Sequence, residues 1–485
     1  MAANSSAYEN PAAVIVLAAG QGTRMKSVKP KVLHEVLGMP LLGHVLLSSS
    51  QLDSKSTVVV VGHGKAEVTQ YLAQSYPKVK TVTQEQQLGT GHAVKVALET
   101  LGDLKTGLVL ILAGDTPLLT NTDLTQLIKA ANGVGGAVLT AHLPDPTGYG
   151  RIVRGADIKV DSIVEQRDAT DTQRAITEVN SGVYVFSAEL LRMALSKIDA
   201  ANDQGEQYLT DVVGILRSAG HEITAVLTSA ENILGVNDRR QLAQAGGVLR
   251  QRIADEWMLA GVTMVDPTSV WIDRTVSLEA DVTLLQNVQL TGTTSIKAGS
   301  VIGPDCTLVN TVVDNDAVVI RSTTKDCQIG NSASVGPFTY LRPGTKLGPK
   351  AKAGGFVEMK NAVLGESAKV PHLSYVGDAE IGEGSNIGAA TVFVNYDGVE
   401  KHRTIVGKHV RVGSDSMLVA PITIGDGAYT AAGSVITEDV PAGAMAVGRA
   451  RQRNILDWVL RRRPGSDSAK AAVADSSSAP SSKKK

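Results

Sequence analysis

Two different hydrophobic patterns divide this chain. Residues 12–237 contain short, continuous apolar runs separated by amphipathic stretches; the clearest are Val14–Ala18, Thr57–Val61, Leu108–Ala113 and Ala137–Ala141. Continuous apolar runs are typical of strands buried on both faces of a largely parallel sheet. We therefore expect an α/β domain in this part of the chain.

In residues 262–448 the apolar residues recur every six positions instead. A helix of 3.6 residues per turn cannot keep such positions on one face, whereas a hexapeptide period is the signature of a parallel β-helix. Each hexad then forms a short strand and a turn, with its aliphatic residue in a narrow core. The register positions are Ile329, Val335, Leu341, Leu347 and Ala353, then Leu364, Val370 and Val376, then Ile381, Ile387 and Phe393, and finally Val406, Val412, Leu418, Ile424, Thr430 and Ile436. The long step between Phe393 and Val406 predicts an inserted loop over Val394–Ile405.

A helix is expected between the two patterns. Leu242, Ala245, Leu249 and Ile253 recur at helical spacing, and Asp238 is placed to cap the helix at its start. The predicted organisation is a disordered tail (1–11), the α/β domain (12–237), a linker helix (238–261), the β-helix (262–448), a short helical segment (449–463) and a disordered polar tail (464–485).

Composition narrows the class of protein. The 485 residues include 47 basic and 48 acidic side chains, so no positive field indicates a nucleic-acid partner. Aromatic residues are only 4%, and 48 glycines fit a coil of tight turns. The two cysteines, Cys306 and Cys327, are too few for a disulfide scaffold and lack metal-ligand spacing. Neither a signal peptide nor a membrane span is apparent, so we expect a cytoplasmic protein with no membrane partner.

The first candidate site follows the first expected strand. In the segment LAAGQGTRM, Gly20 and Gly22 let backbone N–H groups approach a ligand, at the strand end where α/β sheets bind nucleotides. The spacing matches neither the dinucleotide fingerprint, whose third glycine would fall at Met25, nor the P-loop, whose lysine is absent. An ordinary tight turn explains the glycines equally well. Arg24 and Lys31 favour a polyphosphate site because they supply positive charge beside the loop.

A second feature is Asp115, directly after the run Leu108–Ala113. A carboxylate at the tip of a central strand is a natural Mg²⁺ ligand, although an isolated aspartate there can equally be a turn or capping residue. Asn237 is a second candidate ligand.

The motifs, taken together, are recognisable. The segments LAAGQGTRM, QLGTGHA, AGDTPLL, GYGRIV, IVEQRDA, NSGVYVF and GVNDR occur in the order found in sugar-1-phosphate nucleotidyltransferases. With a hexapeptide region behind them, residues 12–458 resemble the bacterial bifunctional N-acetylglucosamine-1-phosphate uridyltransferase/glucosamine-1-phosphate N-acetyltransferase family. The resemblance implies a Rossmann-like α/β nucleotidyltransferase domain, a left-handed parallel β-helix and a homotrimer. It also implies synthesis of UDP-N-acetylglucosamine for cell-wall peptidoglycan.

For the uridylyl site, the resemblance implies in-line attack of N-acetylglucosamine 1-phosphate on the α-phosphorus of UTP, with release of pyrophosphate and with Mg²⁺ as cofactor. Arg24 and Lys31 would be catalytic, and Asp115 and Asn237 would bind the metal. The implied substrate-binding residues are Leu17, Ala18, Ala19, Gly20, Lys31, Gln84, Gly89, Thr90, Ala113, Gly114, Asp115, Gly150, Glu165, Asn180 and Asn237.

For acetyl transfer from acetyl-CoA to glucosamine 1-phosphate, an amine must lose a proton, and a histidine with a pKa near 6.5 suits that task. The resemblance implies His372 as this general base. It places the sugar phosphate on Arg342, Lys360, Tyr375 and Asn386, and acetyl-CoA on Ala389, Asn395, Tyr396, Ser414, Ala432 and Arg449.

Two other functions stay open at this point. One is a single-activity sugar-1-phosphate nucleotidyltransferase with a structural or regulatory β-helix, which does not need His372 or Lys360. The other is a non-catalytic assembly subunit with a degenerate site, which does not need Arg24, Lys31 or Asp115.

Overall fold

The computed structural model describes residues 10–102, 104–200, 202 and 204–478, and its contacts form two compact units, Met1–Lys350 and Ala351–Lys485. The expected disordered tail of residues 1–11 lies outside the described residues except for its last two positions, as do residues 479–485 of the expected C-terminal tail. The border between the units falls inside the hexapeptide region, so the domain borders expected from the sequence stay a prediction.

A nine-stranded mixed sheet forms the centre of the first unit, with the strand order β11-β7-β10-β6-β1-β4-β5 along its main path. Its strands are β1 (Ala13–Ala18), β4 (Thr57–Val61), β5 (Lys80–Thr83), β6 (Leu108–Ala113), β7 (Gly136–His142), β8 (Arg151–Arg154), β9 (Val160–Val164), β10 (Glu178–Ser187) and β11 (Ile223–Leu227). All four apolar runs noted in the sequence are strands. The sheet is less parallel than expected, because β10 runs antiparallel to β6, β7 and β8, and β9 runs antiparallel to β8.

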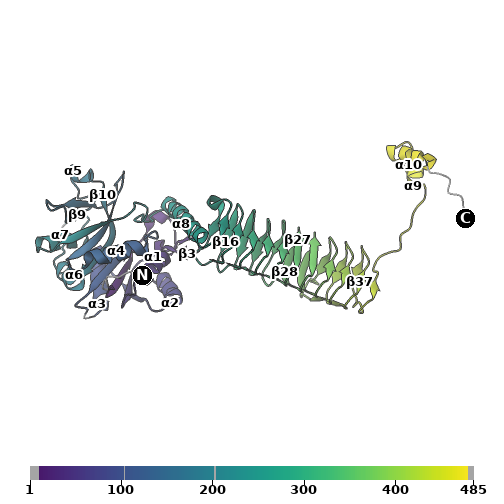
Figure 1. Ribbon diagram of the computed structural model, residues 1–485, viewed down its shortest axis with the longest axis horizontal. Coiled ribbons are helices and arrows are strands. Elements are labelled where there is room, and N and C mark those ends of the chain that lie inside the picture. The colour runs from purple at the N-terminus through teal and green to yellow at the C-terminus, as the bar shows by residue number, and fades with distance from the viewer. Residues whose placement is uncertain (1–9, 103, 201, 203, 479–485) are drawn as a thin grey trace, which may run out of the picture. The chain divides into compact units, whose positions relative to one another are not determined.

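Alternate residues of the central strands enter two separate cores, which explains the continuous apolar runs. Val14 and Val16 of β1 belong to one core, and Ile15 belongs to the other. Helices α1 (Leu41–Ser50), α2 (Lys65–Ser75) and α4 (Asn121–Ala131) pack on the first face, and α3 (Thr90–Thr100), α6 (Ala188–Leu195) and α7 (Asp211–Ser218) pack on the second (Figure 1). The remaining short elements are η1 (Thr23–Met25), η2 (Lys31–Leu33), β2 (Glu35–Val36), β3 (Met39–Pro40) and α5 (Asp171–Arg174).

Helix α8 (Arg239–Leu259) follows the sheet and confirms the expected helix. The Asp238 side chain caps it by accepting hydrogen bonds from the backbone N–H groups of Arg240 and Gln241. Its buried residues Ala245 and Leu249 join a small core with residues of the α/β part, so apolar contact anchors the helix there.

The rest of the first unit is a coil of short strands and the 3-10 helix η3 (Pro267–Ser269). The strands are β12 (Thr263–Met264), β13 (Trp271–Ile272), β14 (Ser277–Leu278), β15 (Thr283–Leu284), β16 (Val288–Thr291), β17 (Ser295–Ile296), β18 (Val301–Ile302), β19 (Cys306–Val309), β20 (Val312–Val313), β21 (Val318–Val319), β22 (Thr323–Lys325), β23 (Gln328–Ile329), β24 (Ser334–Val335), β25 (Tyr340–Leu341) and β26 (Lys346–Leu347). Successive coils pair in parallel, as Leu290 with Leu308 and Leu308 with Thr324.

The second unit continues the same pattern. Its strands are β27 (Lys352–Gly355), β28 (Glu358–Leu364), β29 (Lys369–His372), β30 (Tyr375–Ile381), β31 (Asn386–Ile387), β32 (Val392–Val394), β33 (Thr404–Val406), β34 (Arg411–Val412), β35 (Met417–Val419), β36 (Ile422–Ile424), β37 (Tyr429–Thr430), β38 (Val435–Ile436) and β39 (Met445–Ala446). Every register position read from the sequence is buried, including the aromatic Phe393. This confirms a β-helix with one apolar residue per hexad in its core.

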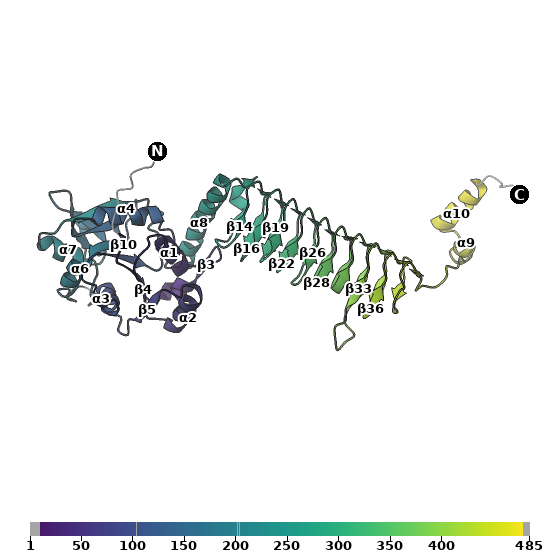
Figure 2. The ribbon, with the colours of Figure 1, turned by 60° about the horizontal axis from the view of Figure 1, so that its bottom comes forward.

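The inserted loop is shorter than expected. Strand β32 keeps Val394 and strand β33 begins at Thr404, so the loop that leaves the coil beside β33 consists of residues 395–403 (Figure 2). A bridge between Tyr396 and Lys401 closes it into a narrow hairpin.

Two helices follow the coil, α9 (Trp458–Arg462) and α10 (Asp467–Ser478). The polar composition of the C-terminal segment did not predict α10, whose alanines favour a helix and whose Lys470 pairs with Asp467 at 3.1 Å. Among the described residues, no helix combines the length and apolar character needed to cross a membrane.

Candidate active sites

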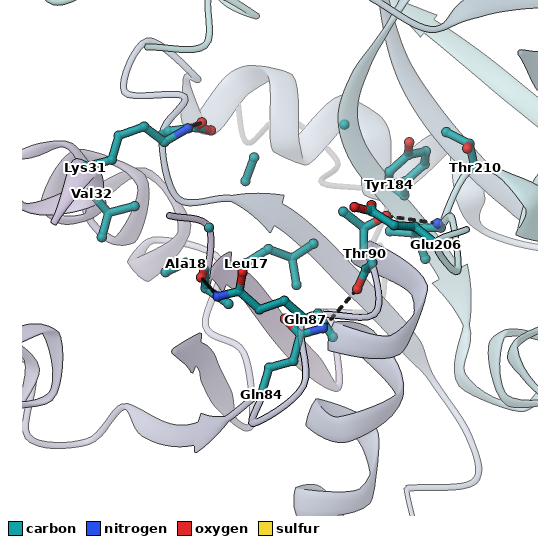
Figure 3. A pocket seen from close by; sticks show the side chains of 18 of the residues that line it. Leu17, Ala18, Lys31, Val32, Gln84, Gln87, Thr90, Tyr184, Glu206 and Thr210 are labelled. Atoms are coloured by element: carbon teal, nitrogen blue, oxygen red, sulfur yellow. Dashed lines mark hydrogen bonds and ion pairs between the residues drawn. The ribbon is translucent and has the colours of Figure 1, made fainter. Parts of the chain in front are cut away.

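A cavity of about 440 Å³ opens at the carboxyl ends of β1 and β6. Figure 3 shows Lys31 at one side of it, Tyr184 and Thr210 at the other, and Gln84 along a third wall. The structure brings most of the expected uridylyl residues to this cavity: Leu17, Ala18, Ala19, Gly20, Lys31, Gln84, Gly89, Thr90, Ala113, Asp115, Glu165 and Asn180 line it. Their expected roles in binding stay predictions.

The glycine-rich loop is shaped by close packing at one glycine and by open space at another. Gly22 has a φ of 62°, and a Cβ atom there would lie 2.5 Å from the Cβ of Lys31. Only glycine therefore lets the loop close onto the Lys31 stem. Gly20 lines the cavity, and a Cβ on it would meet no atom within 4 Å. A side chain at Gly20 would project into this open space, so glycine leaves room for a ligand beside the backbone.

Charged and amide groups meet at the Lys31 side of the cavity. The Lys31 ammonium forms an ion pair with the Asp115 carboxylate and also donates to Asn237 Oδ1 at 3.2 Å. The Arg24 guanidinium donates to the same Asn237 oxygen at 3.0 Å. Arg24 and Asn237 thus stand at the edge of the cavity and are tied to it through Lys31. This group joins residues more than 200 positions apart in the sequence.

The pair Asp115 and Asn237 fits a divalent cation of the magnesium type. Their side-chain oxygens both contact one cationic group, so two hard oxygen donors converge on one place. In the described parts of the chain no cluster of three or more His, Cys, Asp or Glu side chains exists that could hold a metal. Mg²⁺ often takes only one or two protein ligands and keeps water and phosphate oxygens, so a two-residue site suits it.

Polar groups also face the opposite side of the cavity. The Glu165 carboxylate accepts a hydrogen bond from the Thr210 hydroxyl at 3.3 Å, and the Asn180 amide donates to the Tyr184 hydroxyl at 2.6 Å. Burial raises the pKa of Glu165 above its ordinary value, an effect that the Thr210 hydrogen bond partly opposes. Gly150 does not line the cavity but packs behind it: a Cβ there would lie 3.6 Å from Glu165 Oε1.

Gly114 lies behind the cavity as well. Its backbone N–H donates to the Leu17 carbonyl at 2.9 Å, and a Cβ there would lie 3.0 Å from that oxygen. Glycine at this position keeps the ends of β1 and β6 close together, which supports the walls that Leu17 and Asp115 form.

Several lining residues were missed by the sequence analysis. They are Val32, Gln87, Ala93, Gly182, Tyr184, Glu206, Leu209 and Thr210. Gly182 and Tyr184 belong to the motif NSGVYVF, so the motif was a signal for them. The segment from Glu206 to Thr210 carries no motif, and it reaches the cavity because its backbone bonds to the segment around Gly89: Gln207 N–H donates to Leu88 and Gly91 N–H donates to Gln207.

The second unit gathers several of the expected acetyl-site residues around Gly377. Lys360 of β28 lies opposite Gly377 of β30 in the parallel register. A Cβ on Gly377 would lie 2.5 Å from the Tyr375 hydroxyl oxygen and 2.7 Å from Asn395 Nδ2. The missing side chain therefore leaves the space in which the Tyr375 hydroxyl and the Asn395 amide come together.

Asp378 orients the Asn395 amide of this polar group. The sequence analysis did not single out Asp378. Its carboxylate accepts hydrogen bonds from the amides of Asn395 at 2.5 Å and Asn361 at 2.7 Å. Burial raises the pKa of Asp378, but these two bonds and the charges of Lys360 and Lys401 outweigh it and hold the pKa below its ordinary value. A carboxylate, rather than a carboxylic acid, thus orients Asn395.

A second row of expected residues follows neighbouring coils. Asp415 N–H donates to the Ala389 carbonyl, and Gly433 N–H donates to the Ser414 carbonyl, both at 2.8 Å. Ala432 packs on Gly413, and the Arg449 stem lies 3.7 Å from the Cβ position of Gly433. Ala389, Ser414, Ala432 and Arg449 therefore form one continuous strip along this part of the coil.

The remaining expected residues lie at strand ends or in the loop. His372 is exposed at the end of β29, and Asn386 begins β31. Tyr396 is exposed on the 395–403 loop, where its hydroxyl donates to the Gly398 carbonyl at 2.7 Å. Arg342 belongs to the first unit and directly follows β25.

Comparison with known proteins covers both parts of the chain. Residues 14–180 match the MobA-like NTP transferase domain, and residues 403–438 match the bacterial transferase hexapeptide, a family of six repeats. The bifunctional protein GlmU of Streptomyces coelicolor is 55% identical over 96% of this chain and 97% of its own length. The bifunctional protein GlmU of Corynebacterium efficiens is 52% identical over 98% and 99% of the two chains. This chain belongs to the bifunctional GlmU family.

Membership in the GlmU family decides between the functions that the sequence left open. The GlmU relatives are similar over almost the whole chain, including both the cavity of the first unit and the coil of the second. The chain is therefore an enzyme with a nucleotidyltransferase domain and a hexapeptide acetyltransferase domain, whose parallel strands and repeats form a left-handed β-helix. Neither a purely structural coil nor a non-catalytic subunit fits that finding.

Proposed function

We propose that this protein makes UDP-N-acetylglucosamine in two steps, one in each half of the chain. It acetylates glucosamine 1-phosphate with acetyl-CoA and then transfers UMP from UTP to N-acetylglucosamine 1-phosphate, which releases pyrophosphate. The observation that carries the proposal is the cavity at β1 and β6, where basic, acidic and amide side chains from distant motifs converge. The polar group around Gly377 supports the second activity.

The uridylyl step needs little covalent help from the protein, because phosphoryl transfer depends on positioning and on neutralised charge. Lys31 and Arg24 supply positive charge beside the glycine-rich loop, and they steady the triphosphate as pyrophosphate leaves. Glu165 is half-buried and Asn180 is buried in the wall across the cavity, where their polar groups can bind sugar hydroxyls. When bound at Asp115 and Asn237, Mg²⁺ supplies further charge neutralisation for the phosphate oxygens.

The acetyl step requires removal of a proton from the amine of glucosamine 1-phosphate. His372 accepts that proton as the nitrogen attacks the thioester carbonyl, and the CoA thiol then departs with a proton. Lys360 and Arg342 hold the phosphate, and Tyr375 and Asn386 hold the sugar. Acetyl-CoA lies along the strip of Ala389, Ser414, Ala432 and Arg449, with Asn395 and Tyr396 beside it.

The same proposal includes the setting in which the enzyme works. It acts as a homotrimer in the cytoplasm, uses Mg²⁺ and supplies precursors for cell-wall peptidoglycan. Hexapeptide repeats are consistent with self-association, and the balanced overall charge supplies no net positive field that would favour a nucleic-acid partner.

Two separate assays of the wild-type protein test this function. Pyrophosphate is measured with UTP, Mg²⁺ and N-acetylglucosamine 1-phosphate, and free CoA is measured with acetyl-CoA and glucosamine 1-phosphate. The proposal expects both products. Pyrophosphate without CoA would instead leave a single-activity nucleotidyltransferase, and the acetyl half of the proposal would be wrong.

A further inference from the structure

Arg151 is a buried cation at the start of β8, with only 1% of the residue exposed. Its guanidinium donates hydrogen bonds to the backbone carbonyls of Tyr149 and Arg174 and, at 2.7 Å, to the side-chain oxygen of Gln166. Burial lowers the pKa of the guanidinium, an effect that the charge of Asp145 partly opposes. An arginine stays protonated in proteins, and among the described residues none of its hydrogen-bond acceptors is a carboxylate oxygen. The charge is therefore buried without a direct ion pair.

A buried charge of this kind needs a purpose other than filling space. Taking a charge out of water costs free energy, and an apolar side chain of similar volume would fill the same place at lower cost. A guanidinium, however, presents five N–H donors in a rigid, planar fork and can serve several oxygens in fixed directions. A lysine ammonium on its flexible stem cannot do the same.

The three acceptors belong to three different connections of the chain. Tyr149 lies in the turn before β8, Gln166 lies in the turn after β9, and Arg174 ends α5. The Gln166 side-chain oxygen also accepts a hydrogen bond from the Gly148 backbone N–H at 3.2 Å, so it joins the first two turns directly. Arg151 thus ties together segments that lie up to 23 positions away from it in the sequence.

Two of these turns support the polar wall of the cavity. Glu165 lines the cavity from the turn after β9, and Gly150, directly before Arg151, packs behind it. The Gly150 carbonyl accepts a hydrogen bond from the Asn180 backbone N–H at 2.9 Å, and Asn180 lines the cavity as well. A Cβ atom on Gly150 would lie 3.6 Å from Glu165 Oε1 and 3.5 Å from the Asn180 Cβ. The residue next to Arg151 therefore packs against both polar residues of this wall.

We propose that Arg151 is a positioning residue for the acceptor sugar of the uridylyl step: it holds Glu165 and Asn180 at the separation that fits N-acetylglucosamine 1-phosphate. This inference rests on the proposed uridylyl transfer, in which those two residues bind sugar hydroxyls. Within the described part of the chain Arg151 does not line the cavity, and it acts through the turns that its guanidinium connects.

The phosphate side of the cavity depends on a different set of contacts. Lys31 bonds to Asp115 and Asn237, and Arg24 bonds to Asn237. None of these bonds includes Arg151. Loosening the turns that Arg151 connects should therefore weaken binding of the sugar and leave binding of the nucleotide largely intact.

The test variant is Arg151→Lys, which keeps the charge and much of the stem but loses the planar fork. The matched control is Arg192→Lys, because Arg192 also donates to three backbone carbonyls, those of Leu98, Gly102 and Leu104, and does not belong to the described lining of the cavity. Pyrophosphate release gives the KM for N-acetylglucosamine 1-phosphate at saturating UTP, and the KM for UTP at saturating sugar phosphate. We expect Arg151→Lys to raise the sugar KM about fivefold to thirtyfold, the size of one or two hydrogen bonds, and to leave the UTP KM within about twofold of wild type. The control should leave both KM values within about twofold.

Folding is judged from the thermal unfolding of each variant. If Arg151→Lys does not fold, Gln166→Ala replaces it, because it removes the oxygen that joins the two turns and should raise the same KM. A merely structural role for Arg151 predicts a lower melting temperature with both KM values unchanged, and that result would overturn the inference. An equal rise in both KM values, or the same rise in the control, would overturn it as well. A wild type that releases no pyrophosphate from UTP would contradict the proposed function itself, which separates the two failures.

Discussion

Replacing Lys31 by methionine removes one charge from the nucleotide site and keeps most of the side-chain stem. The stem matters because it packs against Gly22 in the glycine-rich loop. The Lys31 and Asp115 side chains are only 14% and 21% exposed, so solvent screens this charge less than it would at the surface. The variant therefore tests charge at a site whose backbone should stay in place.

The expected loss follows from the position of the ammonium group. One unit charge about 4 Å from a phosphate is worth about 4 kcal/mol at an effective dielectric constant of about 20. The loss is smaller than this value because Arg24 keeps its positive charge nearby and because the Asp115 carboxylate already neutralises part of the Lys31 charge. We therefore expect a net loss of about 2–3 kcal/mol, which is about 30- to 150-fold in kcat/KM for pyrophosphate release.

The assay compares pyrophosphate release from UTP with acetyl transfer in the same preparation. Lys29→Met is the matched control, because Lys29 is a nearby surface lysine, 44% exposed and paired with Glu35. It should leave both activities near wild type. A Lys31→Met enzyme that stays within about threefold of wild type would refute the electrostatic argument, and a parallel loss of acetyl transfer would point to misfolding instead.

Three further changes test other parts of the account. His372→Ala should lower the acetylation rate about 10²- to 10⁴-fold, with little change in the KM for acetyl-CoA; a raised KM at unchanged kcat would make His372 a binding residue. Glu165→Gln should raise the melting temperature at pH 8 and leave it unchanged at pH 4. Burial raises the pKa of Glu165 in the folded protein, so its charged carboxylate destabilises the fold only at pH values above the pKa of the unfolded chain. Equal melting curves of variant and wild type at pH 8 would contradict this. Asp378→Ala should raise the KM for acetyl-CoA by freeing Asn395, without affecting pyrophosphate release, and an unchanged KM would remove Asp378 from the site.

The elements that the sequence predicted best are those whose period matches a burial pattern. Leu418 and Ile424 are six residues apart and both face the coil's core, since a hexad returns the chain to the same side. Strand direction is a different matter. The apolar residues of β10 resemble those of β6 and β7, yet β10 runs antiparallel to both strands. The apolar pattern of a strand does not record its direction in the sheet.

The candidate sites show the same limit. Motifs located the residues around Lys31, but the contact of Lys31 with Asn237 depends on how distant strands and loops meet. Thr210 lines the cavity because backbone hydrogen bonds of Gln207 hold its segment beside Leu88 and Gly91. Backbone hydrogen bonds of this kind leave no side-chain motif in the sequence. The hydrogen bonds of Arg151 likewise could not be inferred from the sequence, because their acceptors lie on three connections that only the fold brings together.

The central claim is that one chain carries two separate active sites that share an intermediate, and mixing two inactive variants tests it most directly. Asp115→Ala should lose pyrophosphate release and keep acetyl transfer, and His372→Ala should do the reverse. Neither variant alone should make UDP-N-acetylglucosamine efficiently from glucosamine 1-phosphate, acetyl-CoA, UTP and Mg²⁺. Their mixture should restore it, because N-acetylglucosamine 1-phosphate made by the first can be used by the second. A mixture as inactive as its parts, with each folded variant lacking both activities, would contradict the account.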